Sequence, residues 1–482
     1  MVNQMESVAA SPNRGSVEPA VERQDLGLRR ALSLSPRAWV AVAACMLGVG
    51  LSFGDGHLDA GGVTFLVLTW AALIAAFTSR TADDPRQLER VLEVGVVVQF
   101  AMLFAKPPGG HLLPDLQQAH PYLAPVFPAA GMLMAMLAAT LVIQRPLLGR
   151  ATFPAVLALS GIAAAWMLRA SPHPPIDVLD FARESARALA EGRNPYDLHF
   201  HNLYGDTKFF GPGFATNESI DVGLVYPPLS LLLTAAGEYL VGDSRGTLVV
   251  AVVLAAFLLD RLGGRPARLA ALLFVSTPRQ YFVIEHGWTE PIFVCGFALL
   301  LLLASRRSRW TVAGLAGLLA LKQFAVLFLP LTPLLAGELR PRRSLRLVAG
   351  ALLVAGLLVA PFFLWDPLAY IRSTVLFHLA QPFRPDSLSF AALWVWARHG
   401  VPPPTTVPTL ICLAVAMGVA LRRCRPTPAG FAAGSALVLL ATLAWSKQAH
   451  CNYLYLVVGL LLCSVAASAP RPSGPNDGRT VG

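Results

Sequence analysis

Apolar residues recur along most of the chain in runs comparable in length to a bilayer-spanning helix. The runs lie near 38–53, 61–78, 91–105, 122–143, 151–168, 229–241, 246–259, 267–283, 289–304, 310–336, 345–364, 404–421, 427–445 and 449–467. Since a helix needs roughly 20 predominantly apolar residues to cross a membrane, this pattern predicts an all-α integral membrane protein, a polytopic helical bundle with about 12–14 membrane segments.

Three polar segments interrupt this pattern. Residues 1–36 are rich in Ser, Pro, Glu and Arg, and residues 468–482 are similarly polar, so we expect both to be disordered tails. A long polar stretch at 171–224 follows the fifth apolar run. With the short run after it, it predicts a first large external loop with juxtamembrane helices at 171–244.

The composition supports a membrane protein and excludes several other classes. Of the 482 residues, 55% are hydrophobic and 14% are charged, whereas soluble proteins carry about 25% charged residues. These values exclude a soluble enzyme and a secreted disulfide scaffold. They also argue against a nucleic-acid partner, despite a net charge of +10. The six cysteines lack the spacing of zinc ligands or of a disulfide framework, so we expect no metal site.

The positive charge lies mostly on arginines in short loops between apolar runs. Such loops stay on the cytoplasmic side of a membrane. We therefore expect the N- and C-termini to be cytoplasmic and the loop 171–224 to be external.

Two segments decide this topology. The run 229–241 has only about 13 residues, fewer than a span needs, so we interpret it as a helix in the outer interface. The run 310–336 is flanked by arginines at both ends and is interrupted by Lys322 and Gln323. A two-legged hairpin explains both facts, and it implies a pocket, because irregular backbone at membrane depth must be buried in protein or line a cavity.

With this topology all four lysines fall on the external side: Lys106, Lys208, Lys322 and Lys447. Chance in an arginine-biased composition is one explanation. The other is that Lys322 and Lys447, which interrupt apolar segments, serve a function, because ionisable groups inside a membrane are costly.

Other ionisable and polar groups gather on the same side. They are Asp177 and Asp180, the segment 278–291, Arg384 with Asp386, and the segment 446–453. A polar cluster at one membrane face suits a substrate with an anionic head and an apolar tail.

Asp177 begins a predicted amphipathic helix at 177–191, whose apolar and charged residues separate onto two faces. Its position leaves two interpretations open: a helix N-cap assisted by Asp180, or a functional carboxylate. His286, Trp288 and Glu290 lie on an external turn. A metal site there would need a third ligand, so packing or contact with an acceptor is the better interpretation.

Several short motifs occur in an order that resembles the GT-C superfamily of membrane glycosyltransferases. They are PPID at 174–177, GRNPY at 192–196, YPPLS at 226–230, WTEP at 288–291, the Lys322–Gln323 turn and SKQAHCNY at 446–453. The chain resembles glycosyltransferase family 87, the polyprenol-phosphate-mannose-dependent mannosyltransferases, and related bacterial proteins. The resemblance covers a GT-C-like catalytic core at 151–467. It leaves the membrane helices at 37–150 outside that core, with no assigned task.

The resemblance implies an inverting transfer from a polyprenyl-phosphate-sugar donor on the external face. Asp177 matches the family's general base by position, and Asp180 is the second candidate. The leaving phosphate would contact Lys322, Lys447, Arg384 and Arg279. For both arginines, interfacial snorkelling is an equal alternative. The expected substrate-binding residues are Tyr196, Tyr226, His286, Trp288, Glu290, Gln323 and Asn452. No cofactor is implied, and we expect metal-independent transfer.

Two other functions stay open at this stage. The chain could be a transporter or flippase of a lipid-linked sugar or anionic lipid, although no inverted repeat is visible. It could also be an inactive membrane subunit with the same fold. Mannose is an analogy, and another hexose or a pentose is possible; the acceptor is a glycolipid, a polysaccharide or a protein. Arginine- and alanine-rich usage with few lysines is typical of GC-rich bacteria. We therefore expect a multi-pass protein of the bacterial inner or plasma membrane whose site faces the periplasm or exterior.

Overall fold

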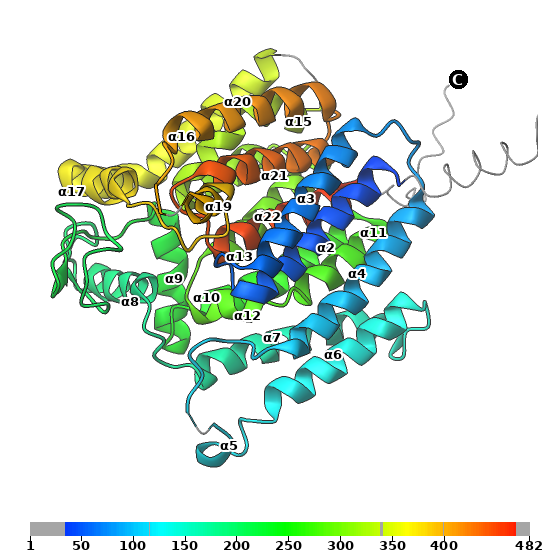
Figure 1. The fold of residues 1–482 in the computed structure, drawn as a ribbon, viewed down its shortest axis with the longest axis horizontal. Helices are drawn as coiled ribbons and strands as arrows, with labels where there is room; N and C mark the ends of the chain where they lie inside the picture. Colours follow the sequence, from blue (N-terminus) through cyan, green and yellow to red (C-terminus); the bar gives the residue numbers. More distant parts are fainter. Residues whose placement is uncertain (1–33, 115, 338–340, 399, 469–482) are drawn as a thin grey trace, which may run out of the picture.

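The computed structural model describes residues 34–114, 116–337, 341–398 and 400–468 (Figure 1). This part of the chain is mostly helical. A single two-stranded antiparallel pair joins β1 (Phe200–His201) to β2 (Ser219–Ile220). The predicted tails at 1–36 and 468–482 fall almost wholly outside the described residues.

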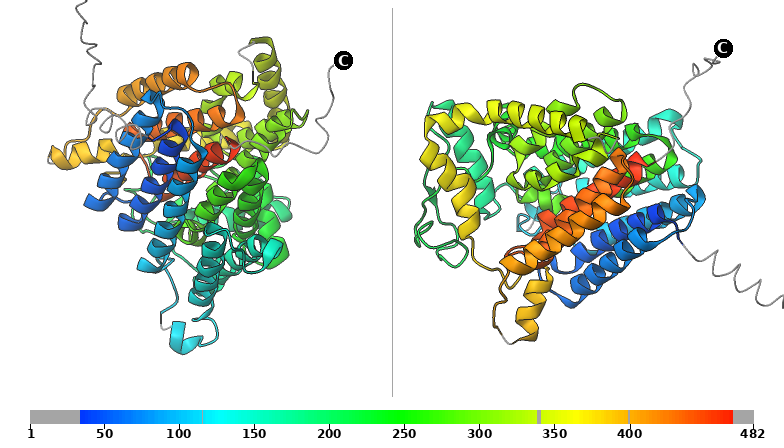
Figure 2. Two further views of the ribbon diagram at one scale, coloured as in Figure 1. Left: turned by 90° about the vertical axis from the view of Figure 1, so that its right-hand side faces the viewer. Right: turned by 90° about the horizontal axis from the view of Figure 1, so that it is seen from above.

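The N-terminal part forms a layer of helices along one side of the bundle (Figures 1 and 2). Its elements are α2 (Pro36–Gly54), α3 (Ala60–Thr78), α4 (Pro85–Ala105), α5 (Leu116–Ala119), α6 (Val126–Val142), η1 (Gly149–Ala151) and α7 (Thr152–Ala170). Side-chain caps start the first two: Ser35 accepts from the Ala38 amide, and Asp59 from the Gly62 amide.

Helix α22 (Cys451–Ala467) is buried along almost its whole length. The remaining membrane-type helices are α10 (Gly246–Leu262), α11 (Gly264–Val275), α13 (Glu290–Ser305), α14 (Thr311–Leu321), α16 (Pro341–Trp365), α20 (Thr406–Arg423) and α21 (Pro428–Trp445). Helix α22 packs against α2 and, among these remaining helices, against α10, α11, α13 and α21. Shorter elements connect them: α12 (Gln280–Glu285), α17 (Pro367–Ile371), the π-helix η3 (Arg372–Leu376), α18 (Phe377–Ala380) and α19 (Phe390–Ala397).

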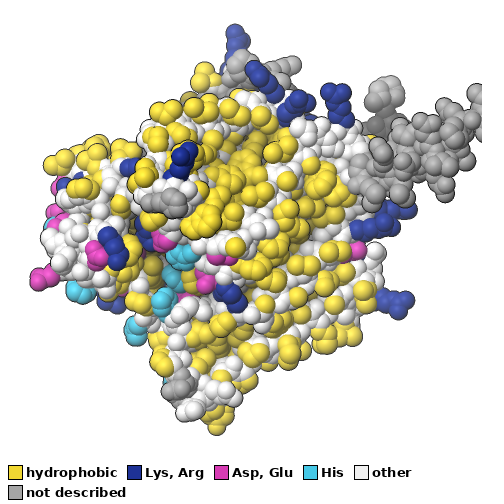
Figure 3. Space-filling view, viewed as in Figure 1, with side chains coloured by type: hydrophobic (Ala, Val, Ile, Leu, Met, Phe, Trp, Pro, Cys, Tyr) yellow, Lys and Arg dark blue, Asp and Glu magenta, His cyan; other side chains and the backbone are white. Residues whose placement is uncertain are grey.

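Six helices in the described residues are long and apolar enough to cross a membrane. Two of them, α16 and α20, leave most of their apolar side chains exposed, and Figure 3 shows continuous apolar surface over the bundle. An exposed apolar surface of this extent requires a lipid environment. The predicted all-α membrane bundle is confirmed at this level.

The apolar run at 267–283 was predicted as one membrane segment, and this prediction is wrong because the run contains two separate helices. The helix stops at Val275, and α12 begins at Gln280. Pro278 lies between them, and a proline lacks the amide hydrogen and clashes with the carbonyl four residues earlier. The break directs Arg279 toward the loop after α2.

The predicted external loop at 171–244 contains two helices. They are α8 (Asp177–Ala190), within the predicted 177–191, and α9 (Pro228–Val241). Both ends of α9 lie beside α8 or the pocket described below. The Tyr239 hydroxyl donates to the Ala186 carbonyl, and Arg183 pairs with Asp243 at 3.2 Å. The helix therefore does not cross the bundle, as expected; its position in the membrane interface stays a prediction.

The predicted hairpin at 310–336 is present. Helix α14 ends at Leu321, Lys322 is extended (φ −146°, ψ 136°), and the chain continues as the 3₁₀-helix η2 (Gln323–Leu331) and α15 (Thr332–Leu335). Thr311 and Leu335 border the same cavity, so both legs start and finish at one end of the bundle.

Two clusters of arginines lie at one end of the bundle, the arginine end, and all four lysines lie toward the other end, which also carries Arg279 and Arg384. The arginine end carries Arg37, Arg80, Arg423 and Arg425 around one cavity and Arg307, Arg309, Arg343 and Arg346 around its neighbour. Helix α2 starts at this end, and the residue that follows it, Asp55, lines the pocket at the other. All four lysines contact residues near that pocket end: Lys106 at Asp55, Lys208 at Phe209, Lys322 at Glu290 and Lys447 at Leu379. Which end faces the cytoplasm is not shown and stays a prediction.

Candidate functional site

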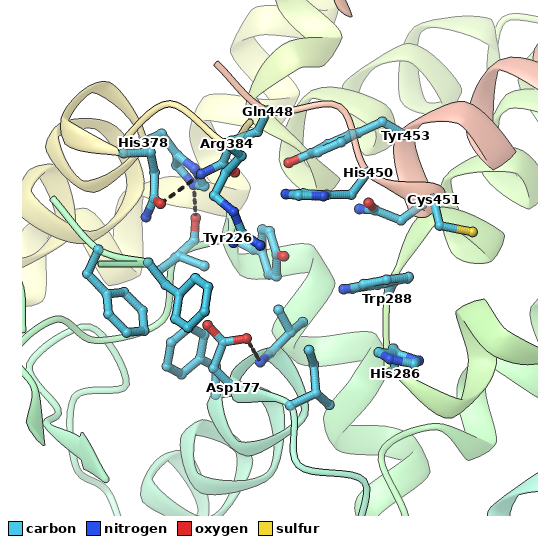
Figure 4. A pocket seen from close by; sticks show the side chains of 18 of the residues that line it. Asp177, Tyr226, His286, Trp288, His378, Arg384, Gln448, His450, Cys451 and Tyr453 are labelled. Carbon is cyan, nitrogen blue, oxygen red and sulfur yellow. Dashed lines mark hydrogen bonds between the residues drawn. The ribbon is translucent and has the colours of Figure 1, made fainter. Parts of the chain in front are cut away.

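A cavity of about 290 Å³ opens at the pocket end (Figure 4). Segments far apart in the sequence form it: the α2–α3 turn, the start of α8, the loops near 204–210 and 225–226, the α12–α13 turn, residues 377–384 and residues 448–453. Of the predicted site residues, the lining includes Asp177, Tyr226, His286, Trp288, Arg384 and Asn452. The structure therefore brings six of the thirteen predicted site residues together at one pocket, whereas no residue of the 310–336 hairpin lines it.

Asp177 is the first residue of α8, and the N-cap is Ile176, so the N-cap interpretation of Asp177 is wrong. Its Oδ1 accepts from the Val178 amide at 2.8 Å and from the Tyr204 hydroxyl at 3.2 Å. No described Lys, Arg or His side chain forms an ion pair with it. Burial raises the pKa of this carboxyl above its ordinary value, and the two hydrogen bonds only partly oppose that effect.

Asp180 lies one turn further along α8, and its side chain does not line the cavity. Partial burial also raises its pKa, against the opposing charges of Arg183 and His201. Because only Asp177 reaches the pocket, the geometry favours Asp177 over Asp180 as a base.

Arg384 enters the pocket from the wall opposite Asp177 (Figure 4). Asp386 holds its guanidinium through two hydrogen bonds, from Nε at 2.9 Å and from Nη2 at 2.7 Å. The guanidinium also lies over the Phe209 ring, 4.7 Å from its centroid. No described residue accepts from Nη1, so this nitrogen can donate to a bound anion.

Lys322 does not line the cavity. Its ammonium pairs with Glu290 at 3.1 Å and lies 3.8 Å from the centroid of the Tyr226 ring, which separates it from the pocket. The Asn452 amide donates to the same Glu290 oxygen at 3.0 Å. The predicted phosphate ligand Lys322 and the predicted substrate contact Glu290 thus pair with each other beneath the pocket wall, through Glu290 Oε1, while Glu290 Oε2 has no hydrogen-bond partner in the described part of the chain.

The two other predicted phosphate ligands also lie outside the lining. Arg279 is 4% exposed and pairs with Asp55 at 2.6 Å. This burial contradicts interfacial snorkelling as well. Lys447 is half-exposed in the α21–α22 loop, not inside an apolar helix, and donates to the Leu379 carbonyl at 2.9 Å.

Tyr196 and Gln323 support the pocket from behind. The Tyr196 hydroxyl donates to the Tyr226 carbonyl at 2.9 Å, and the Gln323 amide donates to the Val225 carbonyl at 2.7 Å. Both fix the backbone that presents the Tyr226 ring, so they are positioning groups and do not touch the cavity.

The sequence analysis missed the contribution of the N-terminal helices. Asp55 and His57, from the α2–α3 turn, line the pocket, as do Tyr204, His378 and His450. The Gly–Asp–Gly–His sequence at 54–57 marks a turn, but nothing local in it indicates its distant partners.

No group of three His, Cys, Asp or Glu side chains in the described residues is placed to hold a metal ion.

Comparisons with protein-family models, curated protein sequences and solved structures found no match to this chain. The functional argument therefore depends on the chemistry of the pocket and on the motifs in the sequence.

Proposed function

We propose that the chain is a membrane glycosyltransferase that moves a sugar, mannose or another hexose or pentose, from a polyprenyl-phosphate-linked donor to an acceptor hydroxyl. The acceptor belongs to a glycolipid, a polysaccharide or a protein. One observation carries the proposal: a half-buried carboxylate without a cationic partner among the described residues, Asp177, faces a guanidinium, Arg384, across one pocket.

In this proposal Asp177 is the general base. The carboxylate takes the proton of the acceptor hydroxyl while that oxygen attacks the anomeric carbon. The bond from the anomeric carbon to the phosphate oxygen breaks on the opposite face, and polyprenyl phosphate leaves with the bonding electrons, so the configuration inverts. A raised pKa makes Asp177 a stronger base than an ordinary aspartate.

Arg384 has the complementary role of stabilising the negative charge on the leaving phosphate. A fixed donor in a site with little water is effective because it needs no reorganisation during the reaction. Asp386 fixes the guanidinium and leaves Nη1 for the phosphate.

The same proposal includes a membrane orientation. The bundle has about 12–14 membrane segments, the termini and the arginine end are cytoplasmic, and the pocket faces the periplasm or exterior of a bacterial cell. The two arginine clusters at the end opposite the pocket support this orientation through the positive-inside rule.

The test uses purified full-length protein in nanodiscs with a panel of polyprenyl-phosphate sugars and lipid extract. Wild type, Asp177→Asn and Asp180→Asn are compared by the release of free polyprenyl phosphate. We expect Asp177→Asn to lower turnover by about 10²–10⁴-fold, the usual contribution of a general base, while Asp180→Asn keeps most of it.

Loss of turnover in Asp180→Asn alone would move the base to Asp180. If wild type releases no polyprenyl phosphate but carries the donor across proteoliposome membranes, the transporter alternative replaces the enzyme.

A further inference from the structure

The α2–α3 turn, residues 55–59, is docked onto the loop that carries Arg384. The Leu58 amide donates to the Asp386 carbonyl at 2.8 Å, and the Leu388 amide donates to the Gly56 carbonyl at 3.2 Å. His57 and Ser387 form an antiparallel bridge. The N-terminal helices are therefore joined to the site by backbone hydrogen bonds as well as by side-chain packing.

Gly56 makes this close docking possible. Its φ is +81°, and a Cβ at this position would lie 2.4 Å from the Cys451 backbone nitrogen. Only glycine satisfies both the backbone angle and the close approach. The turn consequently contacts the 447–451 loop as well as the 384–388 loop.

The docked turn brings His57 to the Arg384–Asp386 pair. His57 Nδ1 lies 3.4 Å from Asp386 Oδ2, the oxygen that accepts from Arg384 Nη2. The Arg384 backbone is also held, because its amide donates to the Lys447 carbonyl at 2.8 Å. With its backbone and one edge of its guanidinium fixed, Arg384 has a single direction in which to present Nη1.

We propose that the α2–α3 turn is a working part of the site, in which His57 and Asp386 position Arg384 to bind the phosphodiester of a lipid-linked ligand. The inference rests on the proposed function, which supplies that ligand class. It assigns a task to helices that lie outside the core defined by the sequence motifs.

The net charge of the group formed by His57, Asp386 and Arg384 depends on the protonation of His57. His57 faces Asp386 and Arg384 from the 384–388 loop and His450 from the α21–α22 loop, and Asp55 shares its turn. The hydrogen bond with Asp386 raises the pKa of the imidazole, although partial burial opposes the shift. Below this pKa the three groups carry one net positive charge, and above it they carry none. Anion affinity should therefore fall as the pH rises through the pKa of His57.

The test measures binding to full-length protein in nanodiscs. The probe is a short-chain prenyl methyl phosphodiester, whose charge is constant near neutral pH, and the matching prenyl methyl ether is the uncharged control. The variants are Arg384→Gln, Asp386→Asn and His57→Gln. His199→Gln is the matched control, because His199 lies 3.3 Å from Asp221 in a similar pair outside the pocket lining.

We expect Arg384→Gln and Asp386→Asn each to weaken phosphodiester binding by about tenfold, the effect of losing a charge-assisted hydrogen bond, with ether binding unchanged. His57→Gln should remove the pH dependence, and His199→Gln should behave as wild type.

The sign of the Asp386→Asn effect is decisive, because this variant also removes a negative charge. Equal or tighter binding would mean that Asp386 only neutralises Arg384, and the inference would be overturned while the proposed function stands. A pH dependence that persists in His57→Gln would overturn the role of His57. If wild type binds the phosphodiester no better than the ether, the lipid-phosphate donor itself is wrong, and the inference falls with it.

Discussion

At the scale of single residues, the reactivity of Asp177 depends on burial and on its hydrogen bond with Tyr204. Burial disfavours the carboxylate, and a donated hydrogen bond favours it. Both groups lie at the pocket surface, and burial together with the nearby Asp177 also raises the pKa of the Tyr204 hydroxyl, so that it stays protonated and donates.

Tyr204→Phe should therefore raise the pKa of Asp177 further. Since a general base must be deprotonated, the acidic limb of the kcat/KM profile should move to higher pH, with the packing of the ring retained. The measurement is transfer rate against pH, with Tyr122→Phe as the control because Tyr122 is 92% exposed and does not line the pocket. A limb that stays in place or moves to lower pH would contradict the role of this hydrogen bond.

The Lys322–Glu290 pair gives a second prediction at this scale. Both side chains are almost fully buried, at 3% and 0% exposure, so removing one partner leaves an isolated charge. Lys322→Met should lower the free energy of unfolding by about 3–5 kcal/mol.

Adding Glu290→Gln should recover much of this loss, because glutamine removes the charge and keeps an acceptor for Asn452. Unfolding by SDS in mixed micelles measures both variants. If Lys322→Met is as stable as wild type, the pair does not carry the charges assigned to it.

At the scale of elements, the position of α8 depends on a buried arginine that follows α9. Arg245 has no exposed surface. Its guanidinium pairs with Asp243 at 2.6 Å and donates to the carbonyls of Ser171 at 2.8 Å and Glu285 at 3.2 Å. It thus ties the end of α7 and the end of α12 to the α9–α10 turn. Asp177 follows α7 by a few residues, so this contact sets where the carboxylate lies.

We expect Arg245→Met to lower the free energy of unfolding by about 3–5 kcal/mol, since it removes the donor to three carbonyls, those of Ser171, Glu285 and Leu168, and leaves Asp243 with Arg183 as its remaining cationic partner. Turnover should fall with it. Arg187→Met is the control: Arg187 is 63% exposed and pairs with Glu238 at 3.4 Å, and exposed pairs contribute only about 0–1 kcal/mol. Equal effects of the two substitutions would show that burial of Arg245 does not matter.

Local sequence patterns were sufficient to predict most of the helices and part of the candidate site. Apolar periodicity located the long helices, and Lys322–Gln323 marked the broken hairpin because two polar residues interrupt an apolar run. Pairings between distant segments were not predictable. Nothing near Lys322 indicates that Glu290 is its partner. The docking of the α2–α3 turn depends on one glycine and on backbone hydrogen bonds with residues 386 and 388. Backbone hydrogen bonds do not require particular side chains, so the amino-acid sequence does not indicate them.

At the scale of the whole molecule, the two arginine clusters at the end opposite the pocket make the orientation testable. Lys208 lies exposed near the pocket, and Arg309 lies exposed at the arginine end. A membrane-impermeant maleimide should label Lys208→Cys in intact spheroplasts and Arg309→Cys only after permeabilisation. The unsubstituted protein controls for its six cysteines, which are buried or half-buried. The reverse labelling pattern would place the pocket in the cytoplasm.

The pocket lining begins at Asp55 and ends at Tyr453, close to the two ends of the described chain. During synthesis the residues around Asp55 leave the ribosome long before residues 448–453, and α22 can pack against α2 only after all the helices between them have been made. A nascent chain that stops before Gln448 contains Asp177 and Arg384 but lacks residues 448–453, which form one side of the pocket. Such a chain also exposes the apolar surfaces that α22 covers. Such a product is a substrate for membrane proteases. A nonsense codon just before Gln448 should therefore abolish function as completely as one near the first helix.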